Sequence, residues 1–234
     1  MLRSRFSKAL AIAGREAVAL AKQAWLLPRD LTTPVVPEAA ADGDDVVVLI
    51  HGLFATAGVL RPLADALGRH VGVHTAALSY APGTSFAQIS DRIGALLEQV
   101  PAGVRVHLVG HSLGGVVGRH YAVVAGDPRV VQTISVASPF GGVTGAATLG
   151  LARDLDPASP LLRELRLADL AASVPHVSIV STDDAVVRAP VSHALPHGEV
   201  VVLHGIGHNA LLFAPEVHRH VVRRVLRRRG QLHG

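Results

Sequence analysis

The pentapeptide Gly110-His111-Ser112-Leu113-Gly114 most constrains the fold, because it follows an apolar run, Val104 to Val109, and opens a helical pattern. A strand, then Gly-x-Ser-x-Gly, then a helix is typical of the nucleophile elbow, a tight turn that holds a serine in strained backbone angles. The turn requires small residues two positions before and after the serine, and both are glycine here. We therefore expect Ser112 to stand above the end of a sheet, with the amide of Leu113 at a helix N-terminus, where negative charge is stabilised.

Acidic and histidine residues follow two later strands of the predicted sheet. Asp183 and Asp184 come directly after a β-branched strand, and His204 and His208 follow the next strand. In folds with this elbow, the acid and then the histidine follow the serine along the chain. Because a parallel α/β sheet carries its site at the carboxyl ends of its strands, one acid and one histidine can meet Ser112.

Apolar strands and amphipathic helices alternate from residue 45 onwards. Predicted strands cover residues 45–50, 73–78, 104–109, 130–137, 177–181 and 199–203, and predicted helices cover 59–69, 86–100, 113–125, 160–171 and 215–229. This order predicts an α/β fold, a mainly parallel sheet of about six strands with helices on both faces. The chain has 234 residues, of which 49% are hydrophobic and 17% charged, so residues 44–234 are expected to form one domain with a sizeable core.

The first 43 residues are expected to form a helix and a linker ahead of this domain. Apolar residues recur at three- and four-residue steps from residue 2 to 27, which predicts an amphipathic helix that Pro28 ends. A Pro/Ala-rich linker follows, up to Gly43. The apolar stripe consists of Leu2, Phe6, Leu10, Ala13, Ala17, Leu20, Ala24 and Leu27. Two placements remain open: the stripe packs on the domain, which we favour, or it contacts a membrane surface.

Five segments between residues 46 and 213 carry a resemblance to a known family. They are Ile50-His51-Gly52-Leu53, Gly110-His111-Ser112-Leu113-Gly114-Gly115, Ser138-Pro139-Phe140-Gly141-Gly142, Ser181-Thr182-Asp183-Asp184 and His204-Gly205-Ile206-Gly207-His208. In these segments the chain resembles small bacterial serine lipases and esterases of the α/β-hydrolase superfamily. The resemblance implies the α/β-hydrolase fold, with Ser112 as nucleophile, His208 as base and Asp184 as the acid that orients it. It also implies that the amides of Leu53 and Leu113 form the oxyanion hole.

The activity that the resemblance implies is hydrolysis of acyl esters through an acyl-enzyme intermediate, with no cofactor and no metal. Thioesters or phospholipids cleaved by the same triad are an alternative, and a non-catalytic binding protein of this fold is another. Phe54 and Phe140 are the expected substrate-binding residues. His111 is expected to be structural. Residues 141–173, the longest excursion between predicted strands, are expected to form a short cover over the site.

Asp184 is the expected triad acid for two reasons. It directly precedes Ala185-Val186-Val187, as the acid does in the small lipases that the chain resembles. Neighbouring side chains in an extended segment also point opposite ways, so only one of Asp183 and Asp184 can reach the histidine.

The amino-acid composition limits the kinds of metal site and binding partner that we expect. The chain has no cysteine, which excludes disulfides, thiolate catalysis and cysteine-ligated metals. Its 14 histidines include no His-Glu-x-x-His pattern, so no metal site is expected. The net charge is +4, with arginines crowded near the C-terminus: Arg219, Arg223, Arg224, Arg227, Arg228 and Arg229. No nucleic acid is expected as a partner, because no recognition motif or aromatic surface accompanies these arginines. We favour a solvated tail, with anionic lipid headgroups as the next partner.

Localisation is expected to be cytoplasmic. The short apolar stretch near the N-terminus is soon interrupted by Arg15 and Glu16, and no signal-peptide cleavage pattern follows it. No uncharged apolar run reaches the length of about 18 residues that a membrane span needs. Peripheral contact with an anionic membrane surface is left open, and the pattern does not determine the oligomeric state.

Overall fold

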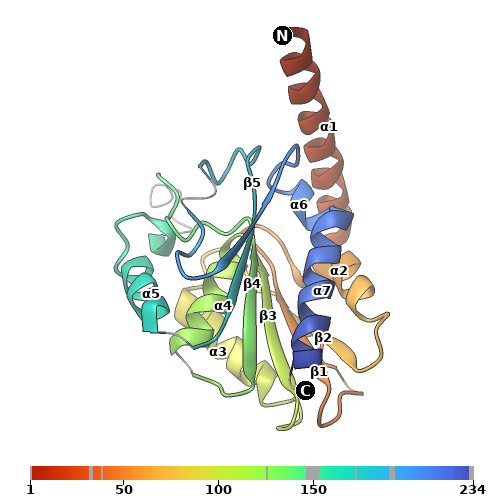
Figure 1. Cartoon of the computed structure of the whole chain (residues 1–234), viewed down its shortest axis with the longest axis vertical. Helices are drawn as coiled ribbons and strands as arrows, with labels where there is room; N and C mark the ends of the chain where they lie inside the picture. Colours follow the sequence, from red (N-terminus) through yellow and green to blue (C-terminus); the bar gives the residue numbers. More distant parts are fainter. Residues whose placement is uncertain are drawn as a thin grey trace.

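A computed structural model describes residues 2–31, 34–37, 39–124, 126–145, 153–171, 173–189 and 193–231. Six strands pair in parallel as one sheet in the order β2-β1-β3-β4-β5-β6 (Figure 1). The strands are β1 (Asp45–Ile50), β2 (Val73–Leu78), β3 (Arg105–His111), β4 (Val130–Val136), β5 (His176–Ser181) and β6 (Glu199–Leu203). The predicted α/β fold, with its mainly parallel sheet of about six strands, is confirmed.

The helices largely follow the predicted periodic segments. They are α1 (Leu2–Leu26), η1 (Ala57–Leu60), α2 (Arg61–Leu67), α3 (Phe86–Leu97), α4 (Leu113–Val124), η3 (Arg153–Leu155), α5 (Pro160–Ala171), α6 (Ala210–Phe213) and α7 (Pro215–Gln231), where η marks a 3₁₀ helix. The helix expected over 59–69 is divided into η1 and α2, because Pro62 favours a helix start near its own position. The pattern did not predict α6, because its four residues form a single turn.

Alternate residues of β1 face two separate halves of the core. Val46, Val48 and Ile50 pack with α3, α4 and α5, whereas Val47 and Leu49 pack with the helices of the opposite face. Every residue of β1 is buried, as expected for a central parallel strand covered on both faces. Figure 1 shows α3, α4 and α5 on one side of the sheet and α1, α2 and α7 on the other.

The strand order reverses at β1, which lies between β2 and β3. The chain therefore winds in one direction from β1 to β2 and in the other from β3 onwards. In open α/β sheets the carboxyl ends of the two strands at such a reversal border the crevice where ligands bind. Here those ends carry His51-Gly52-Leu53 and Ser112.

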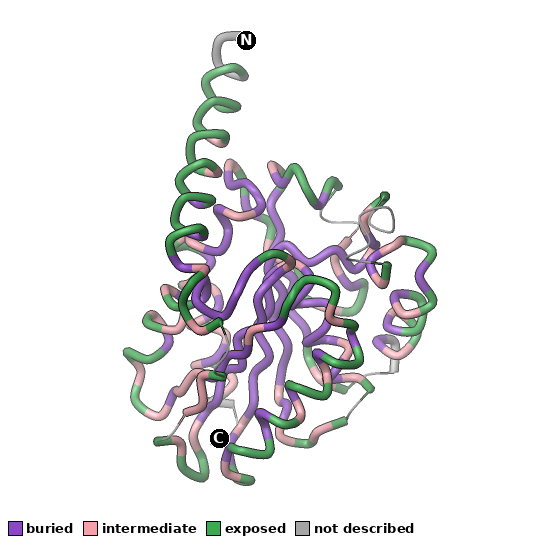
Figure 2. Tube along the Cα trace, turned by 180° about the vertical axis from the view of Figure 1, so that it is seen from behind, coloured by how far each residue is buried: buried purple, intermediate pink, exposed green. Residues whose placement is uncertain are grey.

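The N-terminal helix packs on the domain, but not with the predicted stripe. The side chains that face the domain are those of Ala19, Gln23 and Leu26, which are buried near α6 and η1. Phe6 and Leu10 of the predicted stripe are exposed instead, and Figure 2 shows most of α1 as exposed. The prediction of the packing face was therefore wrong. The small side chain of Ala19 allows a close approach to the domain, and tertiary contacts outweigh the hydrophobic pattern.

The segment predicted as a linker is tied to the sheet. Val35 and Ala77 exchange two backbone hydrogen bonds, with N···O distances of 2.8 and 3.0 Å, in an antiparallel bridge at the edge of β2. Within the described ranges, no helix is long and apolar enough to cross a membrane.

The segment predicted to cover the site is joined to the domain by a buried ion pair. Arg119 of α4 meets the carboxylate of Asp169 of α5 through Nη2 at 2.6 Å and donates from Nε at 2.7 Å. Its remaining nitrogen, Nη1, donates to Val174 O at 2.7 Å and to Thr133 Oγ1 at 3.1 Å. Because removal of either partner would leave an unpaired buried charge, loss of this contact between α4 and α5 would be strongly destabilising. Residues 146–152 of the predicted cover lie outside the described residues.

Candidate active site

Ser112 adopts the strained backbone of an elbow. Its φ is 52°, in the left-handed region that non-glycine residues rarely occupy. The amide of Ser112 donates to Val136 O at 2.8 Å, which ties the turn between β3 and α4 to the end of β4. A side chain at Gly110 would collide with the backbone of Gly114 and Gly115. The two glycines of the pentapeptide thus allow the crossing of strand and helix that raises Ser112 above the sheet.

His208 and Asp184 meet at the ends of the last two strands. The distance from His208 Nδ1 to Asp184 Oδ2 is 2.8 Å, and both side chains are buried. The other carboxylate oxygen, Oδ1, accepts hydrogen bonds from the amides of Val186 and Val187, each at 2.8 Å. A carboxylate held in this way fixes the imidazole with Nδ1 protonated, so its Nε2 is free to accept a proton.

Asp183 points away from His208 and has other partners. Its Oδ2 accepts from the amide of Gly205 at 2.6 Å, and its Oδ1 lies 3.0 Å from Lys8 Nζ. The hydrogen bond from Gly205, followed by that from Lys8, lowers the pKa of this carboxyl below its ordinary value. Neighbouring acids on one loop thus serve two purposes: Asp184 holds the histidine, and Asp183 holds the loop before it.

The loop after β1 brings a second backbone amide towards Ser112. A side chain at Gly52 would place its Cβ only 3.1 Å from Ser112 Cβ, a tight contact, so glycine suits a loop that comes this close. Among the described residues, the Leu53 amide has no hydrogen-bond partner. Leu113 is the first residue of α4, so its amide lacks a partner within the helix. Two amides beside the serine suit an oxyanion that forms there.

His51 fixes the shape of that loop. Its Nδ1 donates to Gly52 O at 2.7 Å and its Nε2 accepts from the amide of Tyr80 at 3.1 Å. The ring stacks on Tyr80 with a centroid separation of 3.9 Å, and the Tyr80 hydroxyl donates to His51 O. From the sequence alone, His51 was predicted only as part of the motif Ile50-His51-Gly52-Leu53. Tyr80 carried no signal there, because its contact depends on how β2 lies beside β1.

His111 connects the elbow to the histidine loop, as its predicted structural role requires. Its Nε2 donates to His208 O at 3.1 Å, and the two rings lie 4.9 Å apart. No hydrogen bond joins Ser112 Oγ to His208 Nε2 in the described part of the chain. Catalytic hydrogen bonds of this kind often form only when a substrate is bound.

Glu16 of α1 was not predicted, yet it holds the backbone directly after His208. Its Oε1 accepts from Asn209 N at 2.9 Å and from Asn209 Nδ2 at 2.7 Å, and its Oε2 accepts from Ala210 N at 3.1 Å. These amides start the short helix α6, so the carboxylate satisfies donors that α6 itself leaves free. No local pattern could reveal this contact, which spans more than 190 residues of sequence.

The two phenylalanines predicted to bind substrate lie in different surroundings. Phe54 is exposed beside Leu53 and has a φ of 58°. Phe140 is 2% exposed, and its ring packs edge-on against His176. A substrate role stays a prediction for both, and the burial of Phe140 favours a place in the core. Within the described ranges, no three His, Cys, Asp or Glu side chains gather as metal ligands.

Buried histidines around the site are expected to make the fold sensitive to acid. Burial lowers the pKa of His51 to about 4 and that of His111 to about 3. Below pH 6.5 the unfolded chain binds protons at these positions and the folded chain does not. The free energy of unfolding should therefore fall by about 1.4 kcal/mol per pH unit for each histidine as the pH drops from 6.5 towards 4.

Urea unfolding at several pH values checks this expectation. His111→Asn should have a smaller slope of stability against pH, whereas His197→Gln, which changes an exposed histidine, should keep the slope. A stability that stays constant between pH 6.5 and 5 would contradict the expectation.

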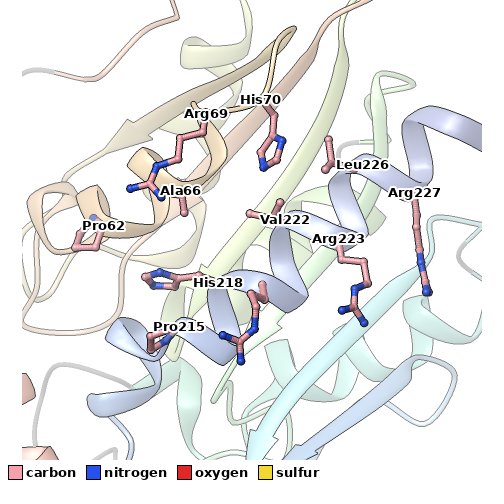
Figure 3. A pocket seen from close by; sticks show the side chains of 11 residues that line it. Pro62, Ala66, Arg69, His70, Pro215, His218, Val222, Arg223, Leu226 and Arg227 are labelled. Carbon is pink, nitrogen blue, oxygen red and sulfur yellow. The ribbon is translucent and has the colours of Figure 1, made fainter.

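A basic groove lies between α2 and α7, with a volume of about 710 Å³ (Figure 3). Its rim carries Arg69, Arg219, Arg223 and Arg227, together with His70 and His218. The three arginines of α7 in this groove are exposed, which is what we expect of side chains in a solvated C-terminal segment. None of the residues discussed at the candidate site lines the groove, so we assign it no part in the chemistry.

Comparisons with known proteins bear on the fold. A family model described as the alpha/beta hydrolase family matches residues 47–198. No curated protein matches the chain. A monoacylglycerol lipase from Paleococcus ferrophilus is similar in structure, with a TM-score of 0.65 and 18% identity over 84% of this chain and 98% of the lipase.

Two further solved structures are similar. A thioesterase domain from the curacin biosynthetic pathway has a TM-score of 0.59 and 16% identity over 80% of this chain and 92% of the domain. A membrane phospholipase A, a bacterial virulence factor, has a TM-score of 0.57 and 16% identity over 94% of this chain and 92% of the phospholipase. At these identities the likeness shows a shared fold.

Proposed function

Because the chain belongs to the alpha/beta hydrolase family, we propose that it is a serine hydrolase that cleaves carboxylic esters through an acyl-enzyme intermediate. The observation that carries the proposal is the 2.8 Å contact between His208 and Asp184, on loops that His111 joins to the strained Ser112. A carboxylate that orients an imidazole is what a general base needs.

In the proposed mechanism, Ser112 Oγ attacks the acyl carbonyl carbon while His208 Nε2 takes the hydroxyl proton. The tetrahedral intermediate collapses, its bond to the alcohol oxygen breaks, and His208 returns the proton to the leaving alcohol. A water molecule that gives a proton to the same nitrogen then attacks the acyl-serine ester. This second attack releases the carboxylic acid and restores the Ser112 hydroxyl.

Fixed charges and dipoles support each stage of this mechanism. The Asp184 carboxylate stabilises the imidazolium that forms when His208 takes the proton, and the amides of Val186 and Val187 keep this carboxylate in place. The amides of Leu53 and Leu113 donate hydrogen bonds to the carbonyl oxygen as negative charge develops on it. Because these donors are backbone groups on packed loops, they need little rearrangement during the reaction.

The same residues would serve thioesters and phospholipids. A lipase, a thioesterase domain and a membrane phospholipase are all among the similar structures, which favours an acyl substrate for this chain but leaves the leaving group open. The exposed Phe54 beside the proposed oxyanion hole favours an apolar acyl group. We therefore place carboxylic esters first and thioesters second.

A serine-directed fluorophosphonate probe and a set of substrates test the proposal. The chain should be labelled by the probe and should hydrolyse p-nitrophenyl esters of graded chain length. Faster cleavage of an acyl thioester than of the matching oxygen ester would identify a thioesterase. A folded chain that is neither labelled nor active would instead be a non-catalytic binding protein.

A further inference from the structure

The outer face of α1 carries an uncharged apolar surface that no described part of the chain covers. Ala19, Gln23 and Leu26 face the domain, and the opposite side of the helix is exposed from Phe6 to Trp25. Phe6 is 74% exposed, and Leu10 and Trp25 are each 66% exposed. This surface, which we name the outer face of α1, consists of Phe6, Leu10, Ala13, Gly14, Ala17, Val18, Leu20, Ala21, Ala24 and Trp25. At 1.5 Å per residue it extends for roughly 30 Å.

The charged side chains of α1 lie between this face and the domain, and almost all of them are positive. Two of the cations, Lys8 and Arg15, also contact loops of the domain. Among the described side chains of the helix, the cations are Lys8, Arg15 and Lys22, which recur every seven residues and so form one line along it. The only described acid, Glu16, is turned inwards and held by Asn209 and Ala210. An apolar face bordered by cations is complementary to a lipid bilayer, which has an apolar interior and negatively charged headgroups.

A groove next to the outer face is also lined by apolar side chains and cations. It lies between α1 and the start of α7, with a volume of about 620 Å³. Val18 and Phe213 contribute apolar wall, and Arg15, Lys22 and Arg219 contribute three cations against the carboxylate of Glu216. Apolar walls with an excess of positive charge fit an anionic amphiphile better than they fit a second copy of this helix, which would bring further cations.

The polar side of α1 holds both loops of the proposed triad. Lys8 pairs with Asp183, directly before Asp184, and Arg15 donates to Gly205 O at 3.0 Å. Glu16 holds the backbone directly after His208. Figure 1 shows the N-terminal turns of α1 projecting beyond the loops at this edge of the sheet. A surface that contacts the outer face would therefore lie close to the proposed catalytic edge.

We propose that the outer face of α1 docks on an anionic lipid bilayer and brings the site to ester substrates held in that bilayer. The choice of substrate rests on the proposed function, whereas the docking itself does not. The apolar side chains enter the boundary between headgroups and acyl chains, and Lys22 reaches phosphate groups at the edge of the helix. Trp25 suits the same boundary, because its ring is apolar and its indole N–H is polar. The guanidinium carbon of Arg29 lies 4.0 Å from the centroid of this ring.

Sedimentation with vesicles of phosphatidylcholine, with or without an equal part of phosphatidylglycerol, tests the docking. The chain should sediment with the anionic vesicles, and less at high salt. Leu10→Glu should weaken this binding by about tenfold or more, because it places a charge in the apolar boundary. Leu20→Glu, on the same face, should act alike. Val71→Glu, which adds the same charge at a 92% exposed valine outside α1, should bind like the original chain.

A second pair of variants tests the charges. Lys22→Gln should weaken binding to anionic vesicles by about fivefold, the effect of one cation near the surface. Arg223→Gln, which removes a cation from the basic groove on α7, should leave binding unchanged. A loss of binding in Arg223→Gln as large as that in Lys22→Gln would show that binding does not depend on the cations beside the outer face of α1, and it would overturn the proposal.

Other outcomes would also overturn the docking. The first is that the original chain does not bind vesicles. The second is that Leu10→Glu and Leu20→Glu bind vesicles as well as the original chain does. The third is that light scattering shows a dimer, which Leu10→Glu converts to a monomer. Hydrolysis of a soluble ester is measured on the same proteins and should be equal in all of them. Vesicle binding without any ester hydrolysis would refute the proposed function and leave the docking standing.

Discussion

Replacing Ser112 by alanine is expected to abolish hydrolysis, with a loss in turnover of about a million-fold and a small residual rate from the oxyanion hole. In the proposed mechanism, Ser112 alone supplies the oxygen that forms the acyl-enzyme. Its φ of 52° is the strained backbone angle of the turn that holds it there. The variant should also lose fluorophosphonate labelling. Alanine adds no bulk at the turn, so the thermal melting temperature should change little.

Ser138→Ala is the matched control for this experiment. Ser138 is a second buried serine close to the elbow, where its Oγ would meet a side chain at Gly115, and that Oγ has no hydrogen-bond partner among the described residues. We expect Ser138→Ala to keep its labelling and most of its activity. If Ser112→Ala kept more than a few per cent of the activity in a preparation free of host esterase, the nucleophile would be another residue.

Replacing Asp184 by asparagine is expected to cost roughly four orders of magnitude in kcat, by analogy with the serine-protease triad. An asparagine amide would donate to His208 Nδ1 and favour the wrong tautomer, so Nε2 could no longer take the serine proton. The present contacts support this expectation, since one carboxylate oxygen faces His208 and the other binds the amides of Val186 and Val187.

Asp183→Asn is the neighbouring control and should cost less than about tenfold, because this side chain binds Gly205 and Lys8 rather than His208. Both variants are compared by kcat/KM on one short-chain ester. The reverse ranking would assign the triad to Asp183, and two nearly normal enzymes would place the acid elsewhere in the chain.

Local patterns were sufficient for most of the sheet and its helices. The predicted bounds of β2, β6 and α5 agree with the structure. In each of them the hydrophobic periodicity and the residues at the ends predict the same element. The start of α3 is another example: the Ser85 side chain caps the helix and forms a capping box with Gln88, three residues later. Such features depend on residues a few positions apart, and they need no knowledge of the remaining chain.

The face of α1 shows where local patterns fail. Its apolar stripe predicted the side that packs on the domain, but the domain binds the side with Glu16, Ala19 and Gln23. The free energy of that contact includes hydrogen bonds from Asn209 and Ala210, which lie at the far end of the chain. A hydrophobic pattern measures only the transfer of one helix out of water, so it cannot weigh such partners.

Residue spacing alone was enough to predict the order of strands and helices, the small residues of the elbow, and the order of serine, acid and histidine along the chain. These follow from spacing and from the steric needs of short segments. Three contacts depend on how the whole chain folds: Asp184 faces His208, His51 and Tyr80 shape the loop beside Ser112, and Glu16 holds the loop that carries His208. Each of these contacts joins segments distant in sequence, and its geometry depends on the register and twist of the whole sheet.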